Sequence, residues 1–273
     1  MADATIRDAL RLSIGTLTAV RVSPPGSIER PVPGWAMALA PLVGVIPGLA
    51  AAIAAWVGIG LQFWPGLTAV LVVGTFALIT RGLHLDGLAD TADGLAASYD
   101  RDKALTVMRR GDTGPTGLAA VVLLLLLQCA ALTQVLSSTA VQFDSGPGGR
   151  VRAVAVVLAV AIAARVAIPV ACVRGVPAAR PEGLGATVAG SVNPNAFGAV
   201  VIVAAIACSL IGRASGYGWA AGALVVIAVV VTTGLLVYRT WRRFGGITGD
   251  VIGAAVEIGT AAALLTLAAS SPS

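Results

Sequence analysis

Charged and aromatic residues are scarce in this 273-residue chain: Asp, Glu, Lys and Arg make up 11% of it, and Phe, Trp and Tyr 5%. Soluble domains carry about 25% charged residues, so the shortage excludes an ordinary soluble fold. The net charge of +5 would suit nucleic acid, but no basic patch is interleaved with aromatic side chains. The composition therefore predicts no nucleic-acid partner.

Cysteine is also rare. Cys129, Cys172 and Cys208 are the three cysteines, and no two of them stand in C-x-x-C spacing. This spacing argues against a disulfide framework and against a cysteine-based metal centre. Each cysteine falls within an apolar run, where it is expected to pack as a small apolar side chain.

Apolar residues, by contrast, are abundant: 57% of the chain is hydrophobic and the mean hydropathy is +0.91. Runs near 20 apolar residues recur, and that length crosses a bilayer. The expected fold class is all-α, a polytopic integral membrane helix bundle in which residues 1–273 form a single integral membrane domain. About seven transmembrane helices are predicted, at 35–61, 64–80, 116–136, 151–173, 196–212, 217–238 and 250–268.

Interfacial amphipathic helices are expected beside these spans. Residues 4–22 alternate apolar and basic positions before Pro24 and Pro25. This pattern predicts that residues 1–30 form an N-terminal interfacial segment lying on the membrane surface. Within the first span, Gly44 and Gly48 either seat a neighbouring helix closely or kink the chain.

Basic residues fall unevenly about the predicted spans. Fourteen of the eighteen lie on the N-terminal side, three on the opposite side, and Arg165 lies within a span. Because cytoplasmic loops carry the excess of Lys and Arg, the N-terminus and the polar segments are expected to face the cytoplasm. Lys103 is the sole lysine, a bias typical of GC-rich bacterial coding. The expected location is therefore the cytoplasmic (inner) membrane of a bacterium.

An acidic motif region at 81–114 stands between apolar runs, on the predicted cytoplasmic side. On a helix, Asp86, Asp90 and Asp93 fall within roughly 60° of one another. Crowded carboxylates favour a bound cation, since like charges at this spacing repel. Oxygen ligands indicate Mg²⁺, with manganese or calcium as alternatives. These three aspartates are the predicted metal ligands.

Two further polar residues begin this region. His84 is the sole histidine, and on an unbroken helix it points away from the aspartates, so substrate binding and a structural hydrogen bond both stay open. Arg81 is placed either to bind a phosphate or to anchor the membrane interface.

Paired arginines follow at 108–117, where Arg109 and Arg110 precede a glycine-punctuated turn. Guanidinium groups and exposed backbone N–H groups suit a phosphate. The alternative is ordinary basic flanking of the next span.

A similar combination of residues occurs at 238–257, where arginines and a glycine-rich turn come before acidic residues at the start of a predicted helix. Asp250 and Glu257 share a helix face, and Arg243 and Thr248 lie just before them. Glu257 lies about two turns inside the span, so it must face a polar cavity or be protonated. A seam of glycines packing another helix is the alternative for the same turn.

Arg165, inside a span, requires a partner, for which Glu257 or a bound phosphate is the candidate. Asn193 lies in a Ser-Val-Asn-Pro-Asn segment in the same cytoplasmic layer, where it either caps a helix or contacts substrate.

Residues 82–95 read Gly-Leu-His-Leu-Asp-Gly-Leu-Ala-Asp-Thr-Ala-Asp-Gly-Leu, a run that resembles the signature of the cobalamin synthase family, the adenosylcobinamide-GDP ribazoletransferases. The resemblance extends to 180–185 and 245–257 and covers essentially the whole chain. One segment departs, because Arg110 stands where the family has an acid and Asp112 where it has a base. That departure leaves the individual roles of these two residues open.

The resemblance implies a Mg²⁺-dependent inner-membrane enzyme that joins adenosylcobinamide-GDP to α-ribazole, or its 5′-phosphate, and releases GMP. Its partners would be these two small molecules and the lipid bilayer; homo-oligomers or association with other corrinoid enzymes stay open. The predicted catalytic residues are Asp86, Asp90, Asp93, Asp250 and Glu257. The predicted substrate-binding residues are Arg81, His84, Arg109, Arg110, Arg165, Arg243, Thr248 and Asn193.

Three other functions fit the residues. A membrane CDP-alcohol phosphotransferase and a prenyltransferase both use aspartate-bound magnesium at a diphosphate. An ion or metal transporter would use the acids as a pathway, but only Arg165 and Glu257 lie well inside the predicted spans, so no relay across the membrane is evident.

Overall fold

The computed structural model describes residues 2–138 and 147–270, and over this range the secondary structure consists of helices, connected by turns and loops, and two isolated bridges. In chain order the helices are α1 (Ala2–Leu17), α2 (Val32–Ala38), α3 (Ala40–Val43), α4 (Val45–Gly60), α5 (Pro65–Ile79), α6 (Leu83–Ala97), α7 (Arg101–Val107), α8 (Pro115–Ser137), α10 (Pro147–Arg165), α11 (Ala167–Ala171), α12 (Leu184–Val188), α13 (Pro194–Ala214), α14 (Trp219–Phe244) and α15 (Gly249–Ala269).

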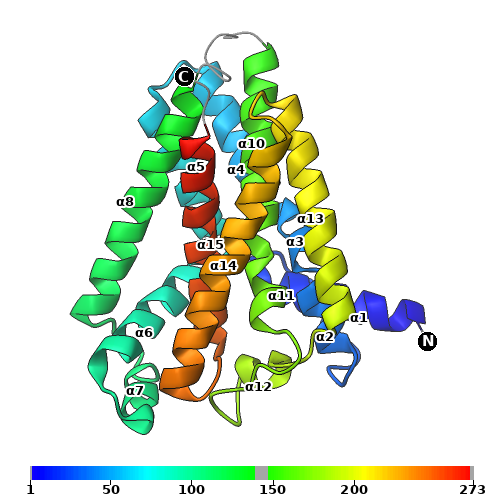
Figure 1. Ribbon diagram of the computed structural model, residues 1–273, viewed down its shortest axis with the longest axis vertical. Helices are drawn as coiled ribbons and strands as arrows, with labels where there is room; N and C mark the ends of the chain where they lie inside the picture. Colours follow the sequence, from blue (N-terminus) through cyan, green and yellow to red (C-terminus); the bar gives the residue numbers. More distant parts are fainter. Residues whose placement is uncertain (1, 139–146, 271–273) are drawn as a thin grey trace.

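Long helices stand side by side along the vertical axis of the molecule (Figure 1). Among the described residues, six helices are long and apolar enough to cross a membrane: Ala40–Gly60, Pro115–Ser137, Gly148–Ala171, Pro194–Ala214, Trp219–Phe244 and Gly249–Ala269. The bent pair of α5 and α6 makes a seventh if it is counted as one span. The predicted all-α, multi-pass membrane bundle is confirmed.

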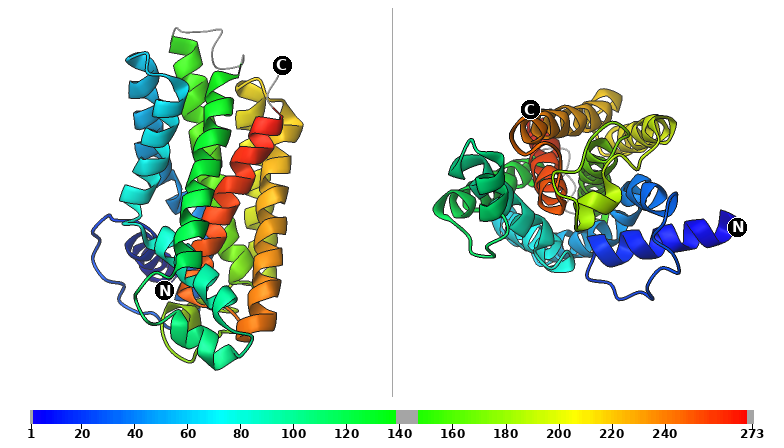
Figure 2. Two further views of the ribbon diagram at one scale, coloured as in Figure 1. Left: turned by 90° about the vertical axis from the view of Figure 1, so that its left-hand side faces the viewer. Right: turned by 90° about the horizontal axis from the view of Figure 1, so that it is seen from below.

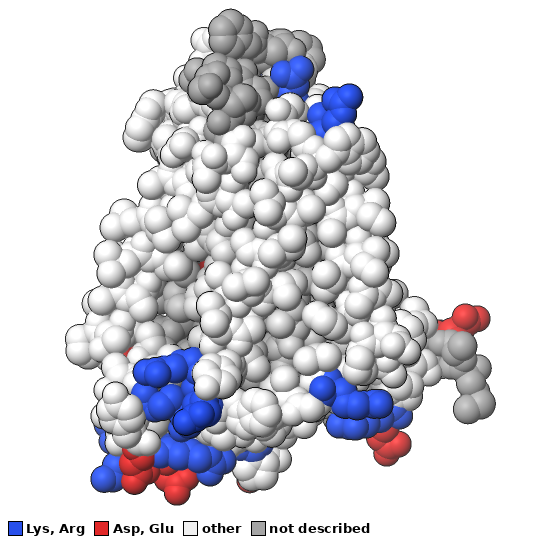
Figure 3. All heavy atoms as spheres, viewed as in Figure 1, with Lys and Arg blue, Asp and Glu red and all other residues white. Residues whose placement is uncertain are grey.

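Exposed basic side chains lie at the two ends of this bundle, whereas Arg165 and Glu257 lie inside it. Figure 3 shows a belt without visible Lys or Arg between an upper end with few basic side chains and a lower end where basic and acidic side chains gather. Such a belt matches the apolar interior of a bilayer. Chemistry that needs charged groups is therefore expected at the lower end, where α6, α7 and α12 lie.

The N-terminal helix α1 lies across the lower end, roughly at right angles to the spans (Figure 2). Ala9 and Ser13 are fully buried where α1 packs on α2 and α3, and Asp8 accepts a hydrogen bond from the backbone N–H of Gly26 at 3.0 Å. The helix ends at Leu17, before the predicted proline stop. Its sideways course is the one predicted for an interfacial segment.

The first predicted span is broken into α2, α3 and α4, with one break at Gly44. A Cβ at Gly44 would lie 2.9 Å from the carbonyl oxygen of Ala161, and one at Gly48 would lie 2.8 Å from the Cβ of Ala161. Both glycines therefore seat α10 closely, which is one of the two predicted roles, and Gly44 also lies at the break between α3 and α4.

A sharp bend separates α5 from the acidic helix α6. Arg81 and Gly82 both adopt left-handed conformations, with φ of 56° and 68°, and the two helices meet at 88°. Glycine adopts this region freely, whereas a side chain there is strained. The bend turns α6 out of the span direction, so the acidic motif lies across the lower end of the bundle instead of continuing through it.

The helix α15 runs through the centre of the bundle and touches α6, α8, α10 and α14. At its start α6 crosses closely, because a Cβ at Gly87 would lie 2.6 Å from the carbonyl oxygen of Asp250. A Cβ at Gly253 would lie 3.2 Å from the Cα of His84. Glycines on both helices thus bring the acidic motif against the start of α15.

Candidate functional site

The three aspartates of α6 lie in different environments. Asp86 is exposed, Asp90 is half-buried and Asp93 is 8% exposed. The helical spacing predicted from the sequence is present, but burial increases along the helix toward α8. The three carboxylates are therefore not equivalent, and each must be assigned separately.

Asp93 holds the beginning of α8. Its Oδ2 accepts a hydrogen bond from the N–H of Gly114 and its Oδ1 one from the N–H of Gly117, each at 2.7 Å. A Cβ at Gly117 would lie only 2.4 Å from Oδ2, so glycine is required for this approach. A carboxylate bonded to orphan N–H groups at a helix start is a strong cap.

Replacing Asp93 with asparagine is expected to lower the thermal unfolding midpoint in detergent by about 4–8 °C, because an amide has one acceptor oxygen and the second buried N–H loses its partner, at ~2 kcal/mol. Differential scanning fluorimetry measures this change. Asp112→Asn, an exposed acid in the neighbouring turn, is the matched control. Equal midpoints for both variants would show that Asp93 does not hold α8.

The start of α15 brings a fourth carboxylate to α6. Thr248 caps the helix, accepting from the N–H of Val251 at 3.3 Å, and its hydroxyl donates to Oδ2 of Asp250 at 3.1 Å. The Nη1 of Arg180 lies 3.9 Å from the same Oδ2. Arg180 also donates from Nη2 to the carbonyl of Leu105 at 3.0 Å. Asp250 therefore sits between a hydroxyl and a guanidinium.

Asp90 lies among these charges. Burial raises the pKa of Asp90 to about 6. The negative charges of Asp250, Asp86 and Asp93 act in the same direction, in that order of strength, and Arg180 acts against them. The cluster thus has more negative charge than Arg180 balances, and a cation would relieve the repulsion.

A pocket of about 270 Å³ opens beside this cluster. Arg180, Thr248 and Asp250 line it together with Leu83 of α6 and residues 182–186. Gly183 is exposed at this pocket, whereas Gly185 is buried and packs tightly on the backbone of Thr248. The pocket therefore combines a guanidinium, a hydroxyl and a carboxylate with exposed backbone, a set suited to a phosphate group and a metal ion.

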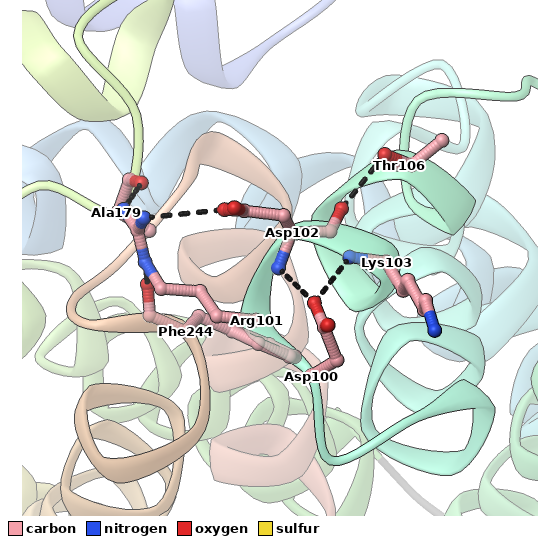
Figure 4. Close-up of polar contacts among 7 residues, drawn as sticks. All are labelled: Asp100, Arg101, Asp102, Lys103, Thr106, Ala179 and Phe244. Carbon is pink, nitrogen blue, oxygen red and sulfur yellow. Dashed lines mark hydrogen bonds and ion pairs between the residues drawn. The ribbon is translucent and has the colours of Figure 1, made fainter.

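Arg101 ties together three segments around this pocket. Its Nε donates to the carbonyl of Phe244 at 2.7 Å and its Nη2 to the carbonyl of Ala179 at 2.6 Å, while Nη1 lies 3.4 Å from Asp102 (Figure 4). Asp100 caps α7, accepting from two backbone N–H groups. The Arg101 side chain thus fixes α7 to the end of α14 and to the segment that carries Arg180.

Arg243 has a similar bracing role. It donates to the carbonyl of Ser98, and its guanidinium carbon lies 4.4 Å from the centre of the Tyr99 ring. The side chain holds the end of α6 to the end of α14. Its predicted contact with substrate stays a prediction.

Behind the acidic motif is a small cavity of about 20 Å³, whose lining combines apolar side chains with several polar and charged ones. His84, 2% exposed, has no hydrogen-bond partner for Nε2 among the described residues. Gln128 donates to Oε2 of Glu257 at 2.9 Å, and Arg165 lines the same space. Glu257 faces a polar cavity, as predicted, and shares it with Arg165 and His84, so these three lie inside the bundle and not in the open pocket.

The other predicted residues are distributed over the lower end. Arg81, Arg109 and Arg110 are exposed. Burial lowers the pKa of Arg180, and the nearby positive charge of Arg109 acts in the same direction. Asn193 caps α13, accepting from the N–H of Asn195 at 2.8 Å. The cluster therefore gathers Asp86, Asp90, Asp250 and Thr248 of the predicted site, with Arg109 nearby.

Arg180 was not among the predicted site residues, although it begins the Arg-Pro-Glu-Gly-Leu-Gly segment of the family resemblance. Arg101 and Gln128 carried no signal in the sequence, since neither belongs to a recognisable motif. Their roles arise from contacts across 78, 143 and 129 positions of the chain.

The donor chemistry of the cluster fits magnesium. In the part of the chain that the structure describes, no three Asp, Glu, His or Cys side chains form a ready metal-binding group. Both oxygens of Asp93 already accept hydrogen bonds, whereas the carboxylates of Asp86 and Asp90 accept none from the described residues. Mg²⁺ is commonly held by one or two carboxylates together with substrate phosphates, so Asp86 and Asp90, with Asp250 beside them, would hold it.

Comparison with known proteins supplies the chemical context. The family described as Cobalamin-5-phosphate synthase matches residues 9–268. Two relatives named adenosylcobinamide-GDP ribazoletransferase are each 41% identical: that of Nocardioides sp. over 97% of this chain and 100% of its own length, and that of Frankia casuarinae over 96% and 95%. One from Bradyrhizobium diazoefficiens is 34% identical over 94% of this chain and 91% of its own. No solved structure matches.

Proposed function

Because the chain belongs to the cobalamin-5-phosphate synthase family, and is therefore a transferase of cobalamin synthesis, we propose that it joins adenosylcobinamide-GDP to α-ribazole or its 5′-phosphate and releases GMP in a Mg²⁺-dependent reaction. The relatives' name supplies the GDP-bearing substrate. A diphosphate needs positive charge on two phosphoryl groups.

The observation that carries this proposal is the convergence of Asp86, Asp90, Asp250 and Arg180 beside one pocket. The bound Mg²⁺ would neutralise charge on the diphosphate. Arg180 binds a remaining phosphoryl oxygen, and the exposed backbone at Gly183 orients the phosphates. A ribose hydroxyl of the acceptor attacks the phosphorus attached to adenosylcobinamide, the P–O bond to GMP breaks, and the hydroxyl proton passes to a carboxylate of the cluster.

The test is product analysis with the purified protein in nanodiscs. With adenosylcobinamide-GDP, α-ribazole and Mg²⁺, GMP and a corrinoid product are expected in equal amounts, and removing Mg²⁺ with EDTA should stop both. Release of CMP from CDP-alcohols, or of pyrophosphate from prenyl diphosphates, would assign a different transferase. Turnover that persists in EDTA would refute the metal requirement.

The raised pKa of Asp90 predicts how the metal requirement depends on pH. Its pKa lies at about 6, above the ordinary value, so its carboxylate becomes protonated as the pH falls through 6 and then competes poorly for a cation. The Mg²⁺ concentration for half-maximal GMP release is expected to rise several-fold between pH 7.5 and 5.5. A requirement that stays constant over this range would contradict Asp90 as a ligand. Asp90→Glu should move the midpoint.

We also propose that the lower end of the bundle faces the cytoplasm and that the membrane is the bacterial inner membrane. Basic residues support this orientation, since the lower end carries more of them than the upper end (Figure 3). In a cysteine-free variant, a cysteine that replaces Ser98, at the end of α6, should be labelled only from the cytoplasmic side. A cysteine that replaces Arg213, in the last turn of α13, should be labelled only from the outside. The reverse labelling would overturn the orientation.

A further inference from the structure

A second pocket, of about 610 Å³, lies at the same end of the bundle, between α2, the start of α13 and the segment 173–192. Its volume falls in the range of small-molecule sites, about 300–1,000 Å³. The lining includes Arg30, Trp35, Arg174, Ser191, Asn193 and Asn195. No step of the proposed reaction uses any of these residues, and only Asn193 was predicted from the sequence to contact substrate.

The charge of this pocket is positive. None of its lining residues is acidic. Within residues 2–138 and 147–270, neither Arg30 nor Arg174 forms an ion pair, whereas Arg180 and Arg101 both do. The Oγ of Ser191 is buried and has no hydrogen-bond partner in the same part of the chain. Two free guanidinium groups and an unused hydroxyl together favour an anionic ligand.

The lining also offers one flat apolar surface and several amide groups. Trp35 is 43% exposed, so its ring is accessible to a ligand. Asn193 uses its side-chain oxygen to cap α13, which leaves its amide N–H₂ and the side chain of Asn195 for other partners. An aromatic ring joined to a phosphate would use both kinds of surface.

The walls are held by backbone contacts. A Cβ at Gly34 would lie 2.4 Å from the carbonyl oxygen of Ser191, so α2 touches the segment directly. The N–H of Arg174 donates to the carbonyl of Val192 at 2.9 Å, which closes the base of the segment. The pocket is therefore part of the folded core at this end and not a gap between loose loops.

One short helix separates the two pockets. α12 touches α2 on one side and α15 on the other. Residues 182–186 line the pocket of about 270 Å³. Arg174 and Ser191, near the two ends of the segment 173–192, line the pocket of about 610 Å³. Ligands in the two pockets would thus be held by one continuous segment of the chain.

From this arrangement we propose that the larger pocket binds the phosphate-bearing, aromatic acceptor substrate, with Arg30 and Arg174 on its phosphate, Ser191 and Asn195 as hydrogen-bonding partners and Trp35 against its ring. The inference rests on the proposed function and deepens it. It makes the enzyme selective for α-ribazole 5′-phosphate over α-ribazole, because the unphosphorylated acceptor leaves both guanidinium groups unpaired.

The test measures KM for each substrate in nanodiscs. Arg174→Gln and Arg30→Gln should each raise KM for α-ribazole 5′-phosphate about tenfold, while KM for α-ribazole and for adenosylcobinamide-GDP changes less than twofold. Arg213→Gln, an exposed arginine at the end of α13, is the matched control. Equal effects on both acceptors, or no effect, would overturn the assignment.

Two further arms separate the alternatives. Repeating the assay in neutral and in anionic lipid shows whether the pocket binds a lipid headgroup instead. If Arg174→Gln changes KM only with anionic lipid, the acceptor assignment is overturned.

Direct titration of the wild-type protein with α-ribazole 5′-phosphate needs no turnover. Binding that weakens in Arg174→Gln supports the pocket even if no GMP is released, and in that case only the proposed reaction fails.

Discussion

Replacing Asp90 with alanine is expected to slow GMP release by about a thousandfold or more, equivalent to ~4 kcal/mol of lost transition-state stabilisation. The reason is its position: Asp90 is half-buried and lies within reach of the charges of Asp86, Asp250 and Arg180. Stopped assays that quantify GMP by chromatography, at saturating Mg²⁺, measure the change. Thermal unfolding should stay within a few degrees of wild type.

Asp102→Asn is the matched control, because Asp102 is an exposed acid at the same end of the bundle, with a side chain 88% exposed and a partner in Arg101. It is expected to retain nearly full activity. Near-normal turnover of Asp90→Ala would remove Asp90 from the metal site. Partial activity in Asp90→Glu, with a shifted Mg²⁺ requirement, would instead support a ligand role, since glutamate keeps the carboxylate but displaces it.

Replacing Arg180 with glutamine is expected to lower kcat/KM for adenosylcobinamide-GDP by about a hundredfold, or ~3 kcal/mol. Arg180 lines the smaller pocket, and its charge lies 3.9 Å from Asp250 and acts on Asp90. Without it the carboxylates lose their counter-charge and the diphosphate loses a guanidinium partner. Initial rates at several concentrations of the GDP-bearing substrate measure the effect.

The Arg180→Lys variant distinguishes a role of Arg180 in binding substrate from a role in holding the segment 173–192 in place. Lysine keeps the charge but not the forked geometry that also reaches the carbonyl of Leu105, so an intermediate rate with a normal unfolding midpoint is expected. If glutamine and lysine variants unfold equally early and lose equal activity, Arg180 acts by holding the segment 173–192 in place. Arg213→Gln, which removes a positive charge from the last turn of α13, serves as the control.

The bundle could be predicted from the sequence because its signal is local. Runs of apolar residues near the bilayer thickness specify spans without any knowledge of partners, and the six long helices lie where those runs are. The bend before α6 is different, since it depends on two consecutive left-handed residues, Arg81 and Gly82. A glycine allows that conformation without requiring it, so the direction of the acidic helix could not be derived.

The candidate site could be predicted in part for the same reason. The spacing of Asp86 and Asp90 on one helix face is a local property, and so is the opening of α15 by Thr248 and Asp250. Asp93 has the same spacing, yet its carboxylate caps α8, because Gly114 and Gly117 come within 2.7 Å of it from another part of the chain. Spacing alone does not distinguish a free carboxylate from one that is already bonded.

The roles of the remaining site residues depend on contacts between distant parts of the chain. Glu257 was predicted to face a polar cavity because an isolated charge inside a span is costly, and it does so. Its hydrogen-bond partner, Gln128, lies on α8 and has no feature that distinguishes it from other polar residues of that span. Arg180 likewise reaches Asp250 only after the segment 173–192 has folded against α15.

The family match selects among the functions that the residues left open. Aspartates beside a diphosphate would equally suit a CDP-alcohol phosphotransferase or a prenyltransferase, and polar groups inside the bundle would suit a transporter. Similarity to adenosylcobinamide-GDP ribazoletransferases over nearly the whole chain selects the transferase of cobalamin synthesis. The geometry then proposes where on the molecule the transfer takes place.

The most direct test of that location is a structure of the protein in nanodiscs with Mg²⁺ and adenosylcobinamide-GDP bound. The diphosphate is predicted beside Asp86 and Asp90, with a phosphoryl oxygen on the guanidinium of Arg180 and the metal between the phosphates and the carboxylates. A diphosphate found instead against Arg30 and Arg174, or at the upper end of the bundle, would contradict the assignment of the site.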